Sequence, residues 1–358
     1  MERTYSYLKI FKHTGKLDAV KRDIIIPPIS IRIKPTNRCN HNCFYCSTPE
    51  RAKYVDGTLD TFNVRDYIPW DIMKDLLEDI KVMEVKSVIL SGGGEPLLYK
   101  YIIPCLELIK EYNINLALIT NGQLLEGQIA ELLKDSKWIR ISLDSPNKEL
   151  FYEIRGLNGD LFDKLCSNIK NFIKIKNENC EVGINCVIHK KNYKYIYEMA
   201  ELAKSLGVNH IKFTPVISRE EAERYHTEIK EEIIKSIENA KELLETDTFK
   251  IFNAYKKEVK AAIKFKRTFT KCPILQISSC IGADCKVYFC HDKLYMKNNS
   301  YGSLKEKRFK DIWFSNKTAK IMKTLNPVND CPHACVWEGR IKLINEYLNL
   351  NENDVDFP

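Results

Sequence analysis

The sequence predicts an α/β fold built on a parallel sheet, because short apolar runs alternate with segments of helical periodicity through the first 215 residues. Six apolar runs have the length of strands: 31–33, 87–90, 116–120, 138–143, 182–188 and 210–214. Helical patterns lie between them, among them 70–82, 99–112, 124–133 and 196–206. Parallel strands bring their carboxyl ends to one edge of a sheet, where barrel folds place their chemistry. Functional residues are therefore expected directly after each run.

Three closely spaced cysteines follow the first predicted strand. Cys39, Cys43 and Cys46 have the spacing C-x3-C-x2-C, and polar residues fill the gap between the first two. Three thiolates on one tight loop can hold an iron–sulfur cluster while one iron keeps no protein ligand. Such an open iron can bind a small molecule, so the spacing indicates chemistry.

Two other uses of these cysteines need weighing. A structural zinc site would have only His41 as a nearby fourth ligand, whereas tetrahedral zinc sites usually combine two ligand pairs. Disulfides are disfavoured because the start of the chain, Met1 to Lys12, is charged and unlike a signal peptide. Thirteen cysteines without such a signal indicate metal binding before disulfides.

With Tyr45 directly before the last thiol, this segment resembles the cluster motif of the radical S-adenosylmethionine (radical SAM) enzymes. The resemblance implies a [4Fe-4S] cluster whose open iron binds S-adenosylmethionine through its amino and carboxylate groups. It also implies one-electron cleavage of that cofactor to methionine and a 5'-deoxyadenosyl radical, with Tyr45 as a cofactor contact. The same chemistry implies a reducing partner such as flavodoxin or ferredoxin.

A second, independent match follows the strand predicted at 87–90. Glycines after a strand let the backbone approach a ligand closely, because no Cβ is in the way. Gly93, Gly94 and Glu95 are similar in kind and order to the family stretch that binds the methionyl amino group. An ordinary strand-to-helix turn is the alternative for the glycines alone.

The six repeats resemble the partial, open (β/α)6 TIM-like barrel of the same family. Polar residues near the other strand ends resemble the positions that meet the cofactor's ribose and carboxylate: Asn121, Ser142, Arg155 and Asn185. The alternative for each of them is a turn-forming or helix-capping role.

The C-terminal part contains a second group of cysteines. Seventeen residues separate Cys272 from Cys290, and Cys331 and Cys335 form a C-x3-C pair. The segment 284–290 has a turn followed by alternation, as in a small hairpin. This pattern resembles the small α+β twitch or shortened SPASM domain, and so implies an auxiliary [4Fe-4S] cluster held by these four cysteines.

Two further cysteines depart from that pattern. The family hairpin normally carries glycine where this chain has Cys285, and Cys280 lies close by. Either one could replace Cys272 or Cys335 as a ligand, or act as a catalytic residue that gives a hydrogen atom to a substrate radical. The alternative is a small buried residue, which is also the interpretation for Cys105, Cys166, Cys180 and Cys186.

Five segments are predicted: an N-terminal extension (1–28), the barrel (29–218), a helical linker (219–268), the auxiliary cluster domain (269–340) and a C-terminal helix with a tail (341–358). The linker is predicted from charged residues at helical spacing. The extension is shorter than the peptide-clamping domain that many peptide-modifying relatives carry before the barrel.

Composition limits the partners. The net charge of +8 is compatible with acidic small molecules, but basic and acidic residues are interspersed, which does not indicate a nucleic-acid groove. No apolar run approaches the roughly 20 residues needed to span a bilayer. No membrane partner and a cytoplasmic location are therefore expected, where reduced thiols persist.

The leading hypothesis is a radical SAM oxidoreductase that abstracts hydrogen from a small polar metabolite, a sugar or aminocyclitol, for oxidation or epimerisation. Modification of a ribosomally made peptide is the alternative, and a non-catalytic iron–sulfur protein is the second alternative. His189, His291, Tyr152 and Trp337 are candidate substrate contacts among which nothing in the chain selects.

Overall fold

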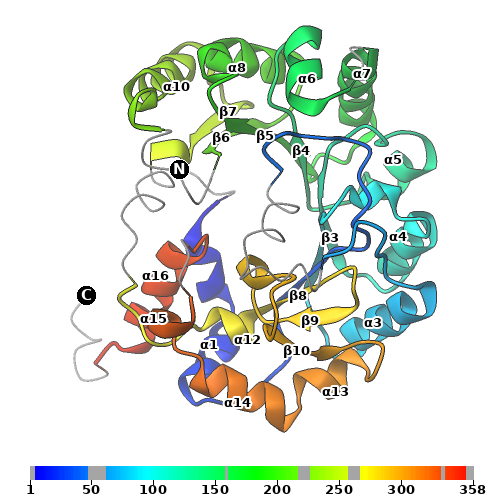
Figure 1. Cartoon of the computed structure of the whole chain (residues 1–358), viewed down its shortest axis with the longest axis vertical. Helices are drawn as coiled ribbons and strands as arrows, with labels where there is room; N and C mark the ends of the chain where they lie inside the picture. Colours follow the sequence, from blue (N-terminus) through cyan, green and yellow to red (C-terminus); the bar gives the residue numbers. More distant parts are fainter. Residues whose placement is uncertain are drawn as a thin grey trace.

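The fold is that of a curved parallel sheet with helices on its outer side, seen in a computed structural model (Figure 1). The structure describes residues 5–46, 62–157, 160–216, 226–256, 267–331 and 335–351. Helices α3 (Trp70–Val82) to α10 (Lys230–Leu244) follow one another around the outside of the sheet, whereas α1 (Thr14–Lys21) lies with the C-terminal elements at its other end.

The described strands form a single ten-stranded sheet in the order β10-β9-β8-β1-β2-β3-β4-β5-β6-β7. Strands β8 and β1 to β7 run parallel, and β9 and β10 form antiparallel pairs at one edge. The strands are β1 (Ser30–Ile33), β2 (Ser87–Leu90), β3 (Asn115–Thr120), β4 (Trp138–Ser142), β5 (Glu181–Ile188), β6 (His210–Pro215), β7 (Lys250–Asn253), β8 (Ser278–Ile281), β9 (Lys286–Tyr288) and β10 (Ser300–Ser303). The predicted partial barrel with a parallel sheet is confirmed.

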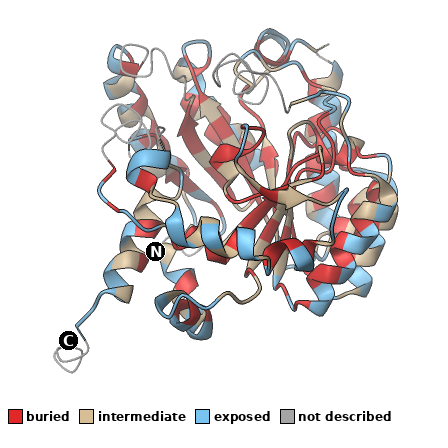
Figure 2. Cartoon of the chain, turned by 60° about the horizontal axis from the view of Figure 1, so that its bottom comes forward, coloured by how far each residue is buried: buried red, intermediate tan, exposed pale blue. Residues whose placement is uncertain are grey.

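Burial alternates along β1, β2 and β4, because one face packs on the helices and the other faces the barrel interior. In β1, Ile31 and Ile33 have no exposed surface, while Arg32 between them is half-buried. In β4, Ile139 and Ile141 are buried beside the half-buried Arg140. Figure 2 shows the same contrast across the molecule, with buried strands inside and exposed outer faces on the helices. The interior face is therefore available for polar and charged side chains.

The α-helices are α1 (Thr14–Lys21), α3 (Trp70–Val82), α4 (Ile102–Glu111), α5 (Gly127–Leu133), α6 (Lys148–Arg155), α7 (Asp160–Ile175), α8 (Ile196–Ser205), α10 (Lys230–Leu244), α12 (Ile274–Ile277), α13 (Phe309–Trp313), α14 (Asn316–Thr324), α15 (Pro327–Asp330) and α16 (Glu338–Leu348). The 3-10 helices are η1 (Tyr7–Lys12), η2 (Pro96–Leu98), η3 (Tyr193–Tyr195) and η4 (His291–Lys293). In α3 the buried residues Met73, Leu76, Leu77 and Ile80 recur at helical spacing, which explains why its periodicity was visible in the sequence.

Helix α6 positions a residue of the candidate site. Asn147 caps its first turn, with the side-chain oxygen accepting a hydrogen bond from Leu150 N at 2.9 Å. Gly156 ends it in the left-handed conformation, with φ +63°, which glycine adopts without steric cost. Arg155 is therefore the last residue of a helix with both ends defined.

Four strands extend the sheet beyond the six predicted ones, and two of these, β7 and β8, pair in parallel with the predicted strands. The segment 219–268, expected to be a helical linker, contains α10 but also β7, which pairs with β6. Strand β8 belongs to the predicted auxiliary domain and pairs in parallel with β1, so that Arg32 lies opposite Cys280. The barrel sheet therefore continues directly into the C-terminal part.

The N-terminal and C-terminal helices pack together near the β8 end of the sheet. Their shared cluster contains Ile10, Leu17, Phe269, Ile274, Ile277, Ile341 and Ile344, all buried. Phe11 also meets Tyr347 edge-on at 4.9 Å between ring centroids. Segments from both ends of the chain thus contribute to the same wall of the barrel.

None of the helices in the described part of the chain combines the length and hydrophobicity needed to cross a lipid bilayer.

Candidate functional site

The loop that follows β1 carries Cys39, Cys43 and Cys46, and its backbone is tied to α6. Asn42 N donates to Arg155 O at 3.0 Å, and Phe44 N donates to Ile154 O at 3.3 Å. Within the loop, Cys46 N donates to Cys43 O at 3.0 Å. The end of α6 therefore fixes the part of the loop that holds the last two thiols.

All three thiols are free, with Cys39 exposed and Cys43 and Cys46 half-buried. His41 N donates to Cys39 Sγ at 3.4 Å, and Arg155 Nη1 donates to Cys43 Sγ at 3.2 Å. Although the residue is exposed, desolvation of its thiol raises the pKa of Cys39 to about 11, and the bond from His41 N partly offsets this shift. Binding of iron would displace these protons, because a metal-bound thiol is deprotonated.

The glycine turn after β2 is pressed against the cysteine loop. Gly94 N donates to Thr36 O at 3.1 Å, and Glu95 N donates to Arg38 O at 2.8 Å. A Cβ on Gly94 would lie 2.0 Å from Arg38 O, a backbone atom that cannot move aside independently. The absence of a side chain at this position is therefore what lets the two loops meet.

The Glu95 carboxylate joins the ends of two strands. It is buried and accepts hydrogen bonds from Leu97 N at 3.0 Å, Thr120 Oγ1 at 2.6 Å and Asn121 N at 2.7 Å. Burial raises its pKa to about 7, although these donors favour the charged form. This side chain acts as a tie between β2 and β3, a role that the motif by itself does not reveal.

A buried group of charges lies behind Cys43. The Asp144 carboxylate has no exposed surface and accepts hydrogen bonds from Tyr45 Oη, from Arg155 Nη2 and, at 2.9 Å, from Val187 N. Arg155 connects Asp144 to the Cys43 thiol. Asp144 was not among the predicted site residues, although it directly follows a predicted strand; its signal was only its place in the segment Ser142 to Ser145.

The remaining predicted cofactor contacts lie at neighbouring strand ends. Asn121 donates through Nδ2 to Asn40 Oδ1 of the cysteine loop at 2.7 Å. Ser142 at the end of β4 is in register with Asn185 of β5, and both are half-buried. Asn185 Nδ2 donates to Thr214 Oγ1 at 3.2 Å. Asn121 is thus in contact with the cysteine loop, whereas Ser142 and Asn185 face the barrel interior.

Two histidines near the loop are packed rings. His189 has no exposed surface and lies against Phe44 and Tyr45, with centroid separations of 4.8 Å and 5.5 Å. His41, the local zinc-ligand alternative, packs edge-on against Phe151 at 5.9 Å. Burial lowers the pKa of His189 to about 4 and that of His41 to about 3. Both rings are therefore neutral at pH 7.

The four cysteines predicted to hold the auxiliary cluster line one small cavity. Its walls include Cys272, Cys290, Cys331 and Cys335 together with mostly apolar side chains. Arg267 and Lys293 are the cations in this wall, and Asp292 N donates to Cys290 Sγ at 3.4 Å. Neither Cys280 nor Cys285 lines this cavity. The predicted ligand set therefore occupies a common wall, and the two spare cysteines lie outside it.

Cys280 and Cys285 differ in their surroundings. Cys280 lines a second cavity together with Arg32 and His291, whereas Cys285 is buried in the main hydrophobic core and does not line it. Cys285 has φ +66°, the left-handed conformation that favours glycine. The turn between β8 and β9 thus has the backbone expected of the family glycine while carrying a cysteine.

Among the four candidate substrate contacts, His291 and Trp337 line that second cavity. Tyr152 is 62% exposed on α6, and His189 is packed as described above.

Within the described ranges, no three His, Cys, Asp or Glu side chains surround a common point as the ligands of a single metal ion do. The donor sets nevertheless fit iron–sulfur clusters. Of the three thiols on one loop, Cys39 receives an N–H donor from His41 and Cys43 one from Arg155, and four further thiols line an apolar cavity together with two cations. Thiolate ligands with N–H donors to sulfur are typical of such clusters.

Comparison with known proteins gives a consistent assignment. The family model described as Radical SAM superfamily matches residues 33–203. A probable GTP 3',8-cyclase of Methanocaldococcus jannaschii is 33% identical over 205 residues, which is 56% of this chain and 63% of that protein. The GTP 3',8-cyclase of Aliarcobacter butzleri is 33% identical over 193 residues, 51% of this chain and 54% of that protein. The chain thus spans less than two thirds of the length of these relatives.

Two solved structures share the fold. Streptococcus suis SuiB bound to the precursor peptide SuiA has a TM-score of 0.60 at 19% identity, covering 88% of this chain and 71% of SuiB. The enzyme anSMEcpe with bound AdoMet has a TM-score of 0.57 at 18% identity, covering 88% of both chains. By its match to the family model, the segment 33–203 is a domain of the radical SAM superfamily.

Proposed function

We propose that this protein is a radical SAM enzyme that abstracts a hydrogen atom from an organic substrate. One observation carries the proposal: the loop with Cys39, Cys43 and Cys46 is hydrogen-bonded to the glycine turn before Glu95. A three-thiol cluster site and a backbone surface without side chains are thereby combined at one edge of a parallel sheet. An electron carrier has no need of the second part.

When bound, the cluster would supply one electron that splits S-adenosylmethionine into methionine and a 5'-deoxyadenosyl radical, which becomes 5'-deoxyadenosine on taking a substrate hydrogen. Around this chemistry the chain's own residues have separate tasks. Gly93 and Gly94 leave space beside the cysteine loop, since a Cβ on either would meet Asn37 or Arg38 atoms at about 2 Å. Arg155 and Tyr45, held by Asp144, would orient the cofactor carboxylate next to Cys43.

The four cysteines that line the C-terminal cavity support an auxiliary [4Fe-4S] cluster, which would supply an electron acceptor near the substrate. With this second site, we propose that the reaction is an oxidation or an epimerisation of a small polar metabolite. Cys280 is the better candidate for a hydrogen-atom donor, because it lines the second cavity and Cys285 does not. A cytoplasmic location and reduction by flavodoxin or ferredoxin stay predictions.

The proposed substrate class is broader than the sugar or aminocyclitol expected from the sequence. The comparisons give no support to a sugar or aminocyclitol, and the relatives' names instead concern a purine nucleotide, GTP. We therefore extend the proposal to phosphorylated metabolites, including nucleotides. Arg32, which projects into the barrel interior from β1, favours such a substrate.

Peptide modification is the second candidate. It is favoured by the fold that the chain shares with SuiB, whose structure contains a precursor peptide. A cationic interior offers less to a neutral peptide than to a phosphate, so we rank this candidate below a small anionic metabolite.

The first experiment measures iron and sulfide in anaerobically reconstituted protein, and 5'-deoxyadenosine after addition of dithionite and S-adenosylmethionine. Wild type is expected to contain about eight irons, and the triple Cys39, Cys43, Cys46→Ala variant about four. 5'-Deoxyadenosine should form with wild type alone. Absence of this product with a fully loaded cluster would refute the proposed activity.

The matched variant Cys272, Cys290→Ala separates the two cluster sites. It is expected to lose about four irons as well, but to keep the electron paramagnetic resonance change that S-adenosylmethionine causes at the first cluster. Unchanged iron content in this variant would remove the auxiliary cluster and the support it gives to an oxidation.

A further inference from the structure

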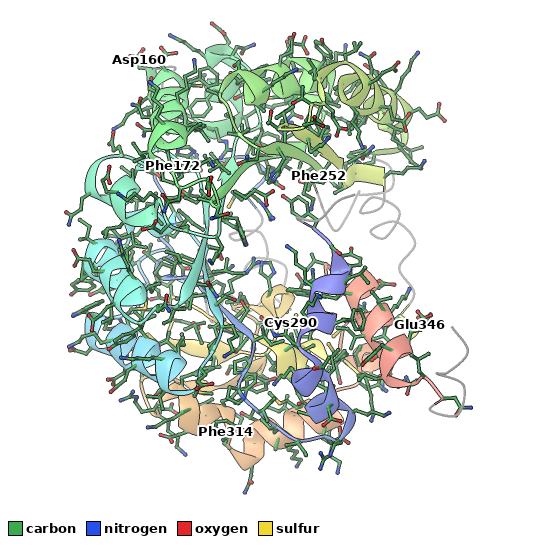
Figure 3. All side chains as sticks on the ribbon, turned by 180° about the vertical axis from the view of Figure 1, so that it is seen from behind. Asp160, Phe172, Phe252, Cys290, Phe314 and Glu346 are labelled. Carbon is green, nitrogen blue, oxygen red and sulfur yellow. The ribbon has the colours of Figure 1, made fainter. Side chains whose placement is uncertain are left out.

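A cavity of about 220 Å³ lies inside the barrel wall near the strands β1 and β8. Its lining includes Lys9 of η1, Arg32 of β1, Cys280 of β8, Cys290, His291 and Arg340 of α16. Cys290, labelled in Figure 3, also lines the cavity of the four C-terminal cysteines. The two cavities are therefore neighbours that share a wall.

The charges around this cavity are of one sign. Lys9, Arg32 and Arg340 line it, whereas none of its described lining residues is Asp or Glu. Arg32 projects from the interior face of β1, because Ile31 and Ile33 on either side of it occupy the opposite face. The cations come from the N-terminal segment, the first strand and the last helix, so only the folded chain brings them together.

The two guanidinium groups have no carboxylate partner among the described residues. Arg340 lies over the rings of Trp337 and Tyr7, at 4.6 Å and 5.4 Å from their centroids. No hydrogen bond or ion pair to Arg32 is found within the described part of the chain, in contrast to Arg155, which is paired with Asp144. Two arginines therefore present their donors to the cavity.

Among the described residues, no acid forms an ion pair with either arginine. Asp292 is a buried acid whose charge acts on Arg32, and its carboxylate is bonded to Val336 N and His291 Nδ1, both at 3.3 Å. The charge of Asp292 raises the pKa of Arg32, and the charge of Glu181 raises that of Lys9. Burial is the larger effect and lowers the pKa of both cations. Arg32 has no paired carboxylate among the described residues, and a bound anion would offset the cost of its desolvation.

We infer that this cavity binds an oxyanion group of the substrate, a phosphate or a carboxylate, through Arg32 and Arg340. The inference rests on the proposed radical SAM function, since it assigns the group to that enzyme's substrate. Guanidinium groups match both oxyanions, because their planar N–H donors form paired, charge-assisted hydrogen bonds. Lys9 adds a third positive charge, and the shared wall at Cys290 brings the anchored substrate close to the auxiliary cysteines.

The test measures binding of inorganic phosphate and of acetate to reconstituted holoprotein in the presence of S-adenosylmethionine. Isothermal titration calorimetry at constant ionic strength is suitable, because salt screens weak electrostatic binding. Arg32→Gln and Arg340→Gln are each expected to lower the affinity for the preferred anion at least about tenfold, since each removes charged hydrogen bonds. Preference for phosphate or for acetate identifies the oxyanion.

Arg140→Gln is the matched control. Arg140 lies on the interior face of β4, over the Tyr5 ring at 5.1 Å, but does not line this cavity. Replacement of Arg140 should change the affinity for the preferred anion less than twofold. Equal weakening by Arg140→Gln would show a diffuse positive potential and overturn the assigned site, as would absence of binding of both anions to wild type.

Folding of the variants is checked by iron content and thermal unfolding. If Arg32→Gln does not fold, Arg340→Gln decides the outcome, because α16 lies at the edge of the fold. Formation of 5'-deoxyadenosine by wild type is a separate measurement. Arginine-dependent anion binding without that product would refute the proposed activity while leaving the anion site in place.

Discussion

Arg155 Nη1 donates a hydrogen bond to Cys43 Sγ at 3.2 Å, although 112 positions separate the two residues in the chain. Its other terminal nitrogen, Nη2, is bound to the buried carboxylate of Asp144. A cation with these partners favours the thiolate form of Cys43, the form that binds iron. The guanidinium group therefore links the end of α6 to the cysteine loop and to the end of β4.

Arg155→Met is expected to destabilise the protein by about 3–5 kcal/mol, because it leaves the Asp144 carboxylate buried without its partner. Urea unfolding measures this change. The control is Arg22→Met, which breaks an exposed pair with Asp18 and should cost only about 0.3–0.5 kcal/mol. Similar costs for the two variants would contradict the buried pair, and the iron content of Arg155→Met reports its effect on the cluster.

Gly94→Ala is expected to cost at least about 2 kcal/mol and to lower iron retention, because its Cβ would overlap the backbone oxygen of Arg38. Gly93→Ala should be milder, since its Cβ meets the side-chain oxygen of Asn37, and moving that side chain breaks its hydrogen bonds with Tyr295 Oη and Asn63 O but leaves the backbone in place. Gly15→Ala, in α1 with open space around it, should stabilise the protein by about 0.5–1 kcal/mol. Thermal unfolding and iron analysis of the three variants test this order, which the reverse ranking would contradict.

Lys16 predicts a specific pH dependence of stability. Burial lowers its pKa from 10.5 to about 7, while its Nζ donates to Ile26 O and Pro27 O at 2.8 Å and 3.0 Å. Between these two pKa values the unfolded chain binds more protons at this site than the native protein, so the contribution to stability rises with pH. The free energy of unfolding of wild type minus that of Lys16→Met should therefore increase from about pH 7 to about pH 10.5. A difference that stays constant or falls would show that the native lysine keeps its proton.

Replacement of the two spare cysteines by glycine should have different costs. Cys285→Gly loses a buried thiol but removes the strain of a side chain at φ +66°, so the net change is expected to stay within about 1 kcal/mol. Cys280→Gly loses burial in an extended strand and adds backbone entropy to the unfolded state, so it should cost more. Denaturant unfolding gives both values, and a larger cost at Cys285 would argue against relief of strain there.

Cys280 and Cys285 should also differ in their effect on turnover. If the reaction ends with hydrogen return from a thiol, Cys280→Ala should abolish incorporation of solvent deuterium into the product, because Cys280, unlike Cys285, lines the second cavity. Cys285→Ala should leave the incorporation unchanged. Retained incorporation in both variants would remove the epimerisation version of the proposal and favour oxidation.

The sequence by itself determined the parallel sheet and the first cluster motif. Alternation and helical periodicity are local properties, so β2 and α3 were predicted with the boundaries they have, 87–90 and 70–82. The C-x3-C-x2-C spacing and the glycine turn are also local, because one short loop contains each of them. These features could be recognised without knowing which segments meet.

Only the tertiary structure decided the partners of these motifs. Asp144 has no local signal that separates it from a turn residue, and its role arises from contacts with Tyr45 of the cysteine loop and Arg155 at the end of α6. The same holds for β7, in which only Ile251 and Phe252 are apolar, and for the pairing of β8 with β1 that puts Cys280 opposite Arg32. The cavity with Lys9, Arg32 and Arg340 combines both ends of the chain with the first strand. Long-range packing controls such contacts, and sequence spacing carries no information about which distant segments will be neighbours.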